Sequence, residues 1–272
     1  MEPGGVAVLN ADLANSDILR RIATENGARI EWFGTSATDW HLKGIRVTPE
    51  ATVITAERHA MPLLFKLSVP GRHFAMNALG VVAVAEALGA DMITACLDIA
   101  RWLPPAGRGT REVIVIDPAK SGEYLELIDD AFNANPTSMS AALEVLATHA
   151  PRDGVGRVKK GRRVAILGDM LELGPDEAAL HSAMAGDPSV DRIDQVHCAG
   201  SRMRALWEAL PEGKRGRWTA TATEMVAECA RLVDAGDIVL VKGSKGSRVS
   251  LVVDAIRKLG QRRPMSEIGD KD

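Results

Sequence analysis

The chain has 272 residues, 46% hydrophobic and 25% charged, a composition typical of a soluble globular protein with one large domain or two ordinary ones. Its formal net charge of −3 gives no basic surface for nucleic acid or for an anionic membrane. No apolar run approaches the roughly 20 residues that span a bilayer, and the first residues do not resemble a signal peptide. With three widely spaced cysteines and no CxxC pair, the chain is predicted to be cytoplasmic, with buried free thiols and without nucleic-acid or membrane partners.

The first hundred residues are predicted to form strands followed by helices. Residues 5–10 (GVAVLN) have the pattern of a buried strand, and Ser16 is predicted to cap the helix that follows. Short alternating segments between 28 and 70 indicate antiparallel strands or hairpins. Two Ala-rich helices are expected between 71 and 100, broken near Gly89. Because the chain opens on a core strand, we expect it to continue something longer.

Two prolines and two glycines in RWLPPAGRGTR mark a boundary between a first domain over 1–104 and a second over 105–272. In the second domain short apolar strands alternate with helices, which implies an α/β fold with a mostly parallel sheet covered on both faces. The strands are expected at 112–117, 124–130, 163–169, 193–200 and 237–244, and the helices at 136–149, 176–186, 201–210, 221–234 and 247–258. The polar last dozen residues are predicted to fray.

Three loops of the second domain carry polar residues at the carboxyl ends of predicted strands, where sheets of this kind bind ligands. DDAFNANP (129–136) offers carboxylates for a ribose diol or a metal, and amides that both donate and accept. GDMLELG (168–174), followed by His181, places acidic residues near a helix N-terminus. KGSKGS (242–247) can hold a phosphate or a carboxylate, but neither it nor any other segment has the GxxxxGK[ST] spacing of a phosphate loop. Each loop, taken alone, is also explained as a turn that caps the next helix.

In this order the three loops resemble the C-terminal motifs of the MurF family of Mur ligases, DD(Y/F)NANP, GDM.ELG....H and KGS. VLNAD (8–12), GRH…N (71–77) and PPAGRG (104–109) also resemble family segments, so the resemblance spans about residues 5–258. The DD(Y/F)NANP form favours this family over the sister ligases that add single amino acids. The implied fold is the remainder of a Mur ligase central ATPase domain, followed by a Rossmann-like, mostly parallel C-terminal domain.

The resemblance implies an ATP-dependent amide ligase that adds D-alanyl-D-alanine to UDP-N-acetylmuramoyl-tripeptide in peptidoglycan precursor synthesis. A carboxylate of the tripeptide takes the γ-phosphoryl group of ATP, and the dipeptide amine attacks the resulting acyl phosphate. This chemistry requires Mg²⁺ on the phosphates, exclusion of water and tight positioning of the amine. ATP and Mg²⁺ are therefore the implied cofactors, and the tripeptide precursor and the dipeptide are the implied partners.

The resemblance also implies roles for individual residues. Asn77 matches an asparagine near adenine, and Arg108 matches an arginine that reaches ATP from the C-terminal domain. Asp130, or alternatively Asp129, matches the acidic residue that holds the ribose hydroxyls. The residues implied to face the dipeptide and the acyl group are Asn133, Asn135, Asp169 and Lys242. Arg108 and Lys242 are the implied catalytic residues and no metal ligand is implied, while Arg108 as a linker residue and Asp169 as a helix cap stay open as alternatives.

The sequence also departs from the family pattern. Where the family has His-Asn, this chain has His73-Phe74, which removes one polar contact near the nucleotide and offers a phenyl ring to adenine instead. In the family the phosphate loop, the carbamylated lysine, the upstream magnesium ligands and the UDP-sugar domain all precede VLNAD. We therefore expect the isolated chain to be a poor catalyst that needs the N-terminal half as a partner.

Two other hypotheses stay open. One is a non-catalytic nucleotide- or dipeptide-binding module derived from the ligase. The other is a different ATP-dependent ligase of the superfamily, such as a folylpolyglutamate-type enzyme, against which the NANP and GDM…ELG loops count.

Overall fold

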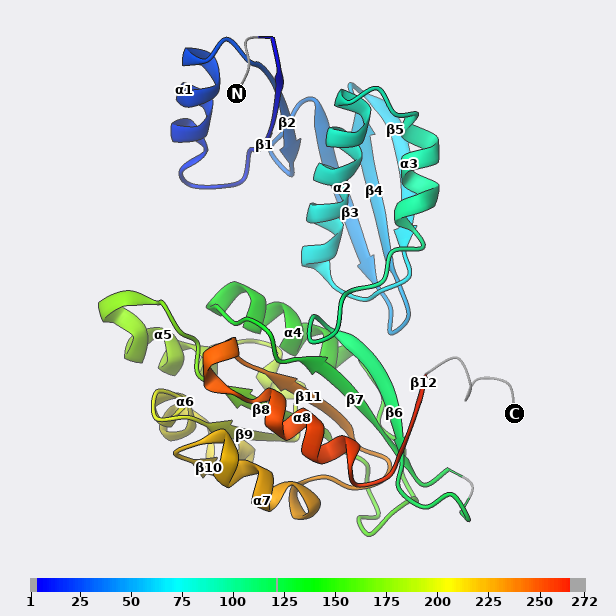
Figure 1. The fold of residues 1–272 in the computed structure, drawn as a ribbon, viewed down its shortest axis with the longest axis vertical. Helices are drawn as coiled ribbons and strands as arrows, with labels where there is room; N and C mark the ends of the chain where they lie inside the picture. The colour runs from blue at the N-terminus through cyan, green and yellow to red at the C-terminus, as the bar shows by residue number, and fades with distance from the viewer. Residues whose placement is uncertain (1–3, 121, 265–272) are drawn as a thin grey trace. The chain divides into compact units, whose positions relative to one another are not determined.

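The computed structural model describes residues 4–120 and 122–264. They belong to two compact units, Met1–Leu103 and Pro104–Asp272, each with a sheet of its own (Figure 1). Within the described residues no helix is long and apolar enough to cross a membrane.

The first unit contains a five-stranded sheet in the order β1-β2-β3-β4-β5. Its elements are β1 (Val6–Asn10), α1 (Ser16–Glu25), β2 (Arg29–Gly34), β3 (Trp40–Val47), β4 (Thr52–Arg58), β5 (Met61–Leu67), α2 (Arg72–Ala87) and α3 (Met92–Ile99). The core lies between α2 and the sheet, where Trp40, Ile54 and Leu79 are fully buried. Burial of such large side chains is the main stabilising contribution in a unit of this size.

The predicted strands and helices of the first unit are confirmed, with two corrections. The prediction of antiparallel pairing is wrong for β2, which pairs in parallel with β1 and with β3; only β3, β4 and β5 pair antiparallel. The cap prediction is also wrong, because Asn15 occupies the N-cap position and Ser16 is the first helical residue. Asn15 makes no side-chain cap hydrogen bond, since its backbone (φ −107°, ψ 19°) lies outside the extended region from which caps act.

The second unit contains a seven-stranded sheet in the order β10-β9-β8-β11-β7-β6-β12. Its strands are β6 (Thr110–Val115), β7 (Tyr124–Asp130), β8 (Arg163–Gly168), β9 (Gln195–Ala199), β10 (Arg215–Thr219), β11 (Ile238–Lys242) and β12 (Gln261–Pro264). Its helices are α4 (Pro136–Thr148), α5 (Glu177–Ala183), α6 (Met203–Ala209), α7 (Ala222–Leu232) and α8 (Ser250–Arg257). One apolar core contains residues of α4 and α6, and another, on the opposite face, contains residues of α7 and α8 (Figure 1).

The mostly parallel sheet of the second unit is confirmed. β11 lies between β7 and β8 and pairs in parallel with both, so the carboxyl ends of these three strands are neighbours. Only β6 and β12, at one edge, are antiparallel to their neighbours. The three cysteines are buried and free, as predicted.

Two edge strands were not predicted. β10 has the polar sequence RGRWT and pairs only with β9. The prediction of a frayed end is wrong for Gln261–Pro264, which forms β12 because its backbone completes the hydrogen bonds of β6. The rest of that prediction, 265–272, lies outside the described residues.

Candidate functional site

The three motif loops meet at the carboxyl ends of β7, β8 and β11, called here the carboxyl edge of the second sheet, and Ser244 connects them. Its amide donates a hydrogen bond to the carbonyl of Asp169 in the GDM loop (3.0 Å). Its buried hydroxyl accepts from the amide of Leu171 (3.0 Å) and donates to the carbonyl of Ala134 in the NANP loop (3.3 Å). One side chain of the KGS loop therefore fixes the spacing of all three loops.

Glycine permits this close approach. A Cβ on Gly243 would lie 3.0 Å from the Cα of Gly168 and 2.7 Å from the Oγ of Ser247, so any larger residue would separate the ends of β8 and β11. The GDM loop is held from its other side by the buried His181, whose Nε2 accepts from the amide of Met170 (3.0 Å). Its Nδ1 donates to the carbonyl of Glu177 (2.6 Å), so the imidazole links the GDM loop to the first turn of α5.

Lys242 and Asp130 form a buried ion pair at the centre of this edge. Lys242 is 2% exposed, and its Nζ donates to Oδ2 of Asp130 (2.7 Å) and to the carbonyl of Asn133 (2.9 Å). Burial raises the pKa of Asp130 above its ordinary value, although the charge of Lys242 acts in the opposite direction. Among the described residues the second oxygen, Oδ1, has no hydrogen bond, so it can accept one from a ligand.

The carboxylate of Asp129 has different partners from that of Asp130, because successive residues of a strand face opposite sides of the sheet. Its carboxylate is 2.9 Å from Nη2 of Arg257, which also binds Glu112. Asp129 is 5% exposed and also accepts from the amide of Ala131 (3.3 Å). These contacts give Asp129 a structural role and favour Asp130 as the carboxylate available to a ribose.

Two of the predicted substrate-binding residues cap helices. Asn135 Oδ1 accepts from the amide of Ser138 (2.8 Å) in a capping box at the start of α4, with Pro136 in the first turn of that helix. Asp169 Oδ1 accepts from the amide of Met203 (2.9 Å) at the start of α6, and burial raises the pKa of this carboxyl. Asp169 thus binds the N-terminus of α6 and not that of α5, the next helix along the chain, and contact of either residue with substrate stays a prediction.

The remaining predicted residues are exposed. The side chain of Asn133 makes no hydrogen bond within the described part of the chain. The guanidinium of Arg108 lies over the ring of Phe132, with Cζ 4.2 Å from the ring centroid, and the Nζ of Lys245 is 5.8 Å from the same centroid. No role was predicted for Phe132, Lys245 or Ser244, although an aromatic residue in a polar loop was a signal that could have been used.

Asn77 belongs to the first unit, where it is exposed on α2. Gly71 precedes this helix with a φ of +141°, and its amide donates to the hydroxyl of the buried Thr52 (2.9 Å). Phe74 packs against His73, with ring centroids 3.9 Å apart, and against Trp102 at 5.4 Å. Stacking of Phe74 on adenine stays a prediction.

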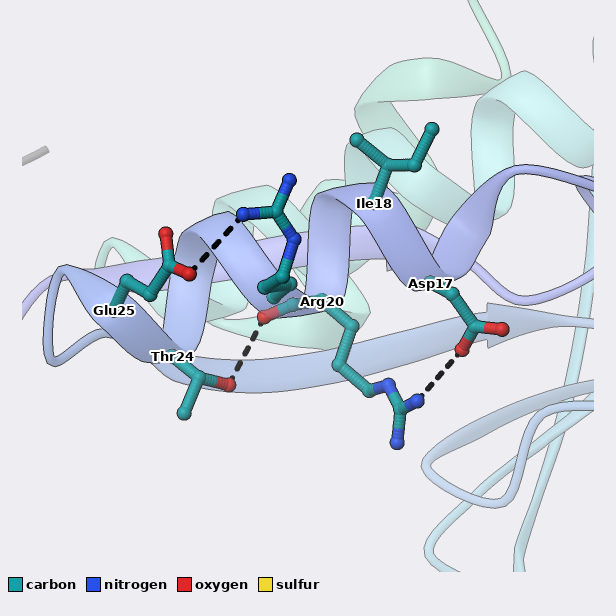
Figure 2. A pocket seen from close by; sticks show the side chains of 6 residues that line it. Asp17, Ile18, Arg20, Thr24 and Glu25 are labelled. Carbon is teal, nitrogen blue, oxygen red and sulfur yellow. Dashed lines mark hydrogen bonds and ion pairs between the residues drawn. The ribbon is translucent and has the colours of Figure 1, made fainter.

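A separate surface hollow lies on α1 (Figure 2). Its side chains pair with one another along the helix: Arg20 binds Asp17 at 2.8 Å and Arg21 binds Glu25 at 3.2 Å. Exposed pairs three or four residues apart contribute only a few tenths of a kcal/mol, about 0.3–0.5 each. No motif residue lines this hollow, so we assign it no function.

Comparison with known proteins identifies the family. Residues 1–85 match the Mur ligase middle domain, and residues 118–245 match the Mur ligase, glutamate ligase domain. With the two sheets and the convergent loops described above, the chain belongs to the Mur ligase family, whose members are ATP-dependent ligases. The predicted resemblance is confirmed.

Within this family the relatives are UDP-N-acetylmuramoyl-tripeptide–D-alanyl-D-alanine ligases. The chain is 29% identical over 260 residues to that of Escherichia coli (strain K12), covering 94% of this chain and 53% of the relative. It is 33% identical over 279 residues to that of Mycobacterium tuberculosis (strain H37Rv), covering 93% and 51%. The chain thus spans about half the length of the curated relatives it matches.

Solved structures show the same fold. MurF from Acinetobacter baumannii matches with a TM-score of 0.73 and 24% identity, over 94% of this chain and 52% of that one. MurF from Thermotoga maritima in complex with ADP matches with a TM-score of 0.70 and 20% identity, over 94% and 54%.

Proposed function

We propose that this chain is the ATP- and dipeptide-handling part of a ligase that adds D-alanyl-D-alanine to UDP-N-acetylmuramoyl-tripeptide in peptidoglycan precursor synthesis. The observation that carries this proposal is the junction at Ser244, which holds the DDAFNANP, GDMLELG and KGSKGS loops in one fixed arrangement. The names of the relatives supply the substrates. Because ATP and UDP-linked precursors are cytoplasmic metabolites, we place the reaction in the cytoplasm.

The free oxygen of Asp130 suits a ribose hydroxyl, and the exposed guanidinium of Arg108 suits a phosphate, with which it can form two parallel hydrogen bonds. We assign the adenine contact to Asn77. A lysine ammonium has three donors, and Lys242 uses two of them on the NANP loop, so one remains for the acyl group.

The amide of Asn133 can both donate and accept, which suits the polar backbone of a dipeptide. Asn135 retains its side-chain NH₂ while its oxygen caps α4, and Asp169 orders the loop beside it. These residues would position the attacking amine, and correct positioning of the two reactants contributes much of the rate of such a reaction.

ATP supplies the phosphoryl group that activates the carboxylate, and Mg²⁺ would accompany its phosphates. Among residues 4–120 and 122–264, no group of three or more His, Cys, Asp or Glu side chains is arranged to hold a metal ion. We therefore assign no Mg²⁺ ligand to this chain and no step to a metal bound by it.

The test is ATP-dependent ligation with purified chain, Mg²⁺, the UDP-linked tripeptide and D-alanyl-D-alanine, with and without a separately expressed N-terminal half of a MurF ligase. We expect product only when the second half is present. D130N should then raise the KM for ATP, while D191N, which removes one exposed carboxylate elsewhere, should not. No product in either case from a folded chain would refute the ligase and favour the binding module.

A further inference from the structure

A cavity of about 380 Å³ lies at the amino ends of β7 and β11, at the opposite end of the second sheet from the motif loops. Its walls come from the loop between β6 and β7, the loop before β8, the end of α7 and the segment after α8. Its volume falls in the range of small-molecule sites, about 300–1,000 Å³. No residue with a role in the proposed function lines it. The five residues of β11 lie between the two ends and rise roughly 3.3 Å each, so roughly 15 Å separates the cavity from the carboxyl edge.

The floor of this cavity is apolar. Ile116 and Leu259 are half-buried and pack against the core that contains residues of α7 and α8. Val233, which also lines the cavity, is buried in the same core. Because the floor continues the core, water in the cavity covers apolar surface. An apolar group that displaces this water would therefore be bound favourably.

One guanidinium is fixed at the wall of the cavity. Nε of Arg157 donates to Oδ1 of Asp234 (3.2 Å). Its Nη2 donates to the carbonyls of Ala230 (2.9 Å) and Val233 (2.8 Å). The third nitrogen, Nη1, makes no hydrogen bond within residues 4–120 and 122–264, and 64% of the side chain reaches solvent. Two N–H groups of a side chain that is already ordered are thus available to a ligand, and such preorganisation lowers the entropy lost on binding.

The two carboxylates that line the cavity are already bound. Asp234 is buried, and its Oδ2 accepts from the amides of Arg157 (2.6 Å) and Val158 (2.7 Å). Glu123 accepts from Nζ of the exposed Lys120 (3.1 Å), and an ion pair of this exposed kind is weak enough to yield to a ligand. A ligand in the cavity would therefore meet hydrogen-bond donors beside an apolar floor, an arrangement that suits an anion with an apolar body.

We infer that this cavity is a binding site for a small amphipathic anion, a carboxylate or sulfonate carried on an apolar body. Arg157 binds the anionic oxygens through Nη1, and Lys120 adds a second positive charge at the rim. The apolar body of the ligand covers Ile116 and Leu259. Because hydrogen bonds to an ionised group are roughly twice as strong as neutral ones, the charge of the ligand decides its affinity. The inference goes beyond the proposed function, which places the ligands of the ligase at the carboxyl edge.

The experiment is calorimetric titration of the purified full chain with octanoate, with 1-octanol as the matched uncharged probe. We expect saturable binding of octanoate and at least tenfold weaker binding of octanol. A230F places a ring in the cavity but keeps the carbonyl that binds Arg157, so it should weaken octanoate binding at least tenfold. The matched control is A227F, the same change at an exposed alanine of α7 that does not line the cavity, and it should leave the affinity unchanged.

The charges are tested separately. R157Q should weaken octanoate binding about tenfold and K120Q about threefold, whereas K159Q, at an exposed lysine outside the cavity, should have no effect. Because R157Q also loses the contacts with Asp234, urea unfolding checks its stability, and A230F tests the site if R157Q does not fold.

Several results would overturn the inference. They are the absence of saturable octanoate binding, equal affinities of octanoate and octanol, and equal affinities of A230F and A227F for octanoate. Equal losses in R157Q and K159Q would indicate attraction to net charge alone. Displacement of octanoate by ATP or D-alanyl-D-alanine would place it at the carboxyl edge and would also refute a separate site. Failure of the ligation assay leaves these results intact, so the two proposals can fail separately.

Discussion

The ion pair between Lys242 and Asp130 allows a quantitative test of how this edge of the sheet is stabilised. K242M removes the ammonium but keeps a long apolar stem at a position that is 2% exposed. Loss of one partner from a buried pair costs about 3–5 kcal/mol, because the remaining charge stays desolvated. Since 21% of the Asp130 side chain reaches solvent, we expect the lower end of that range, about 3 kcal/mol.

The control is a double-mutant cycle. D130N removes the carboxylate, so adding it to K242M should recover roughly 2 kcal/mol of the loss. Urea unfolding followed by far-UV circular dichroism gives the free energy of unfolding for the unchanged chain, both single variants and the double variant. A loss below about 1 kcal/mol in K242M, or an equal loss in K242M and K242M/D130N, would refute the reasoning.

The same variant has a predicted pH dependence. Burial already raises the pKa of Asp130 in the folded chain, and removal of Lys242 should raise it further. A carboxyl whose folded pKa exceeds its unfolded value binds protons more readily when folded, so its contribution to stability is present at low pH and is lost as pH rises. The free energy of unfolding of K242M should therefore differ less from that of the unchanged chain at pH 5 than at pH 8.

Three further substitutions test other parts of the second unit. S244A removes the hydroxyl shared by two loops and should lower the free energy of unfolding by about 2 kcal/mol, or the Tm by roughly 4–8 °C. The exposed control S201A should change the Tm little, and equal Tm values for the two variants would contradict the role of Ser244. Burial lowers the pKa of His197 to about 4, so the unfolded chain protonates first and the free energy of unfolding falls as pH drops from about 6.5 to 4. Between pH 7 and pH 5, H197Q should therefore lose about 2 kcal/mol less of its free energy of unfolding, measured in urea, than the unchanged chain loses. An equal loss in both proteins would count against this reasoning. G168A adds a methyl group that overlaps a buried valine and should lower stability by about 2–3 kcal/mol, whereas G213A, with no atom within 4 Å, should be neutral; similar urea midpoints would show that β8 can move away from the new methyl.

Much of the second unit could be predicted because its central strands are apolar along their whole length. IVLVK (238–242) is buried at every position, as expected for a strand covered on both faces. The edge strands β10 and β12 could not be predicted in this way, since RGRWT and QRRP have the polar composition of strands that pair on one side only. Their backbone pairing, rather than a buried side-chain pattern, determines their conformation.

The location of the candidate site was predictable, but its internal contacts were not. Polar residues after three strands indicated the carboxyl edge. The pairing of Lys242 with Asp130 depends on β11 lying between β7 and β8, and no local sequence pattern specifies that order. The contact of Arg108 with Phe132 likewise joins the loop before β6 to the loop after β7.

The junction at Ser244 has a consequence for motion. Loops at the end of a sheet ordinarily open one at a time, each with a small local free energy. Here the amide of Leu171 and the carbonyl of Ala134 share a single hydroxyl, so release of either loop exposes a partner in the other. The three loops should consequently exchange their amide hydrogens as one cooperative segment, and the edge that receives the ligands would be either assembled or open, with few intermediate states.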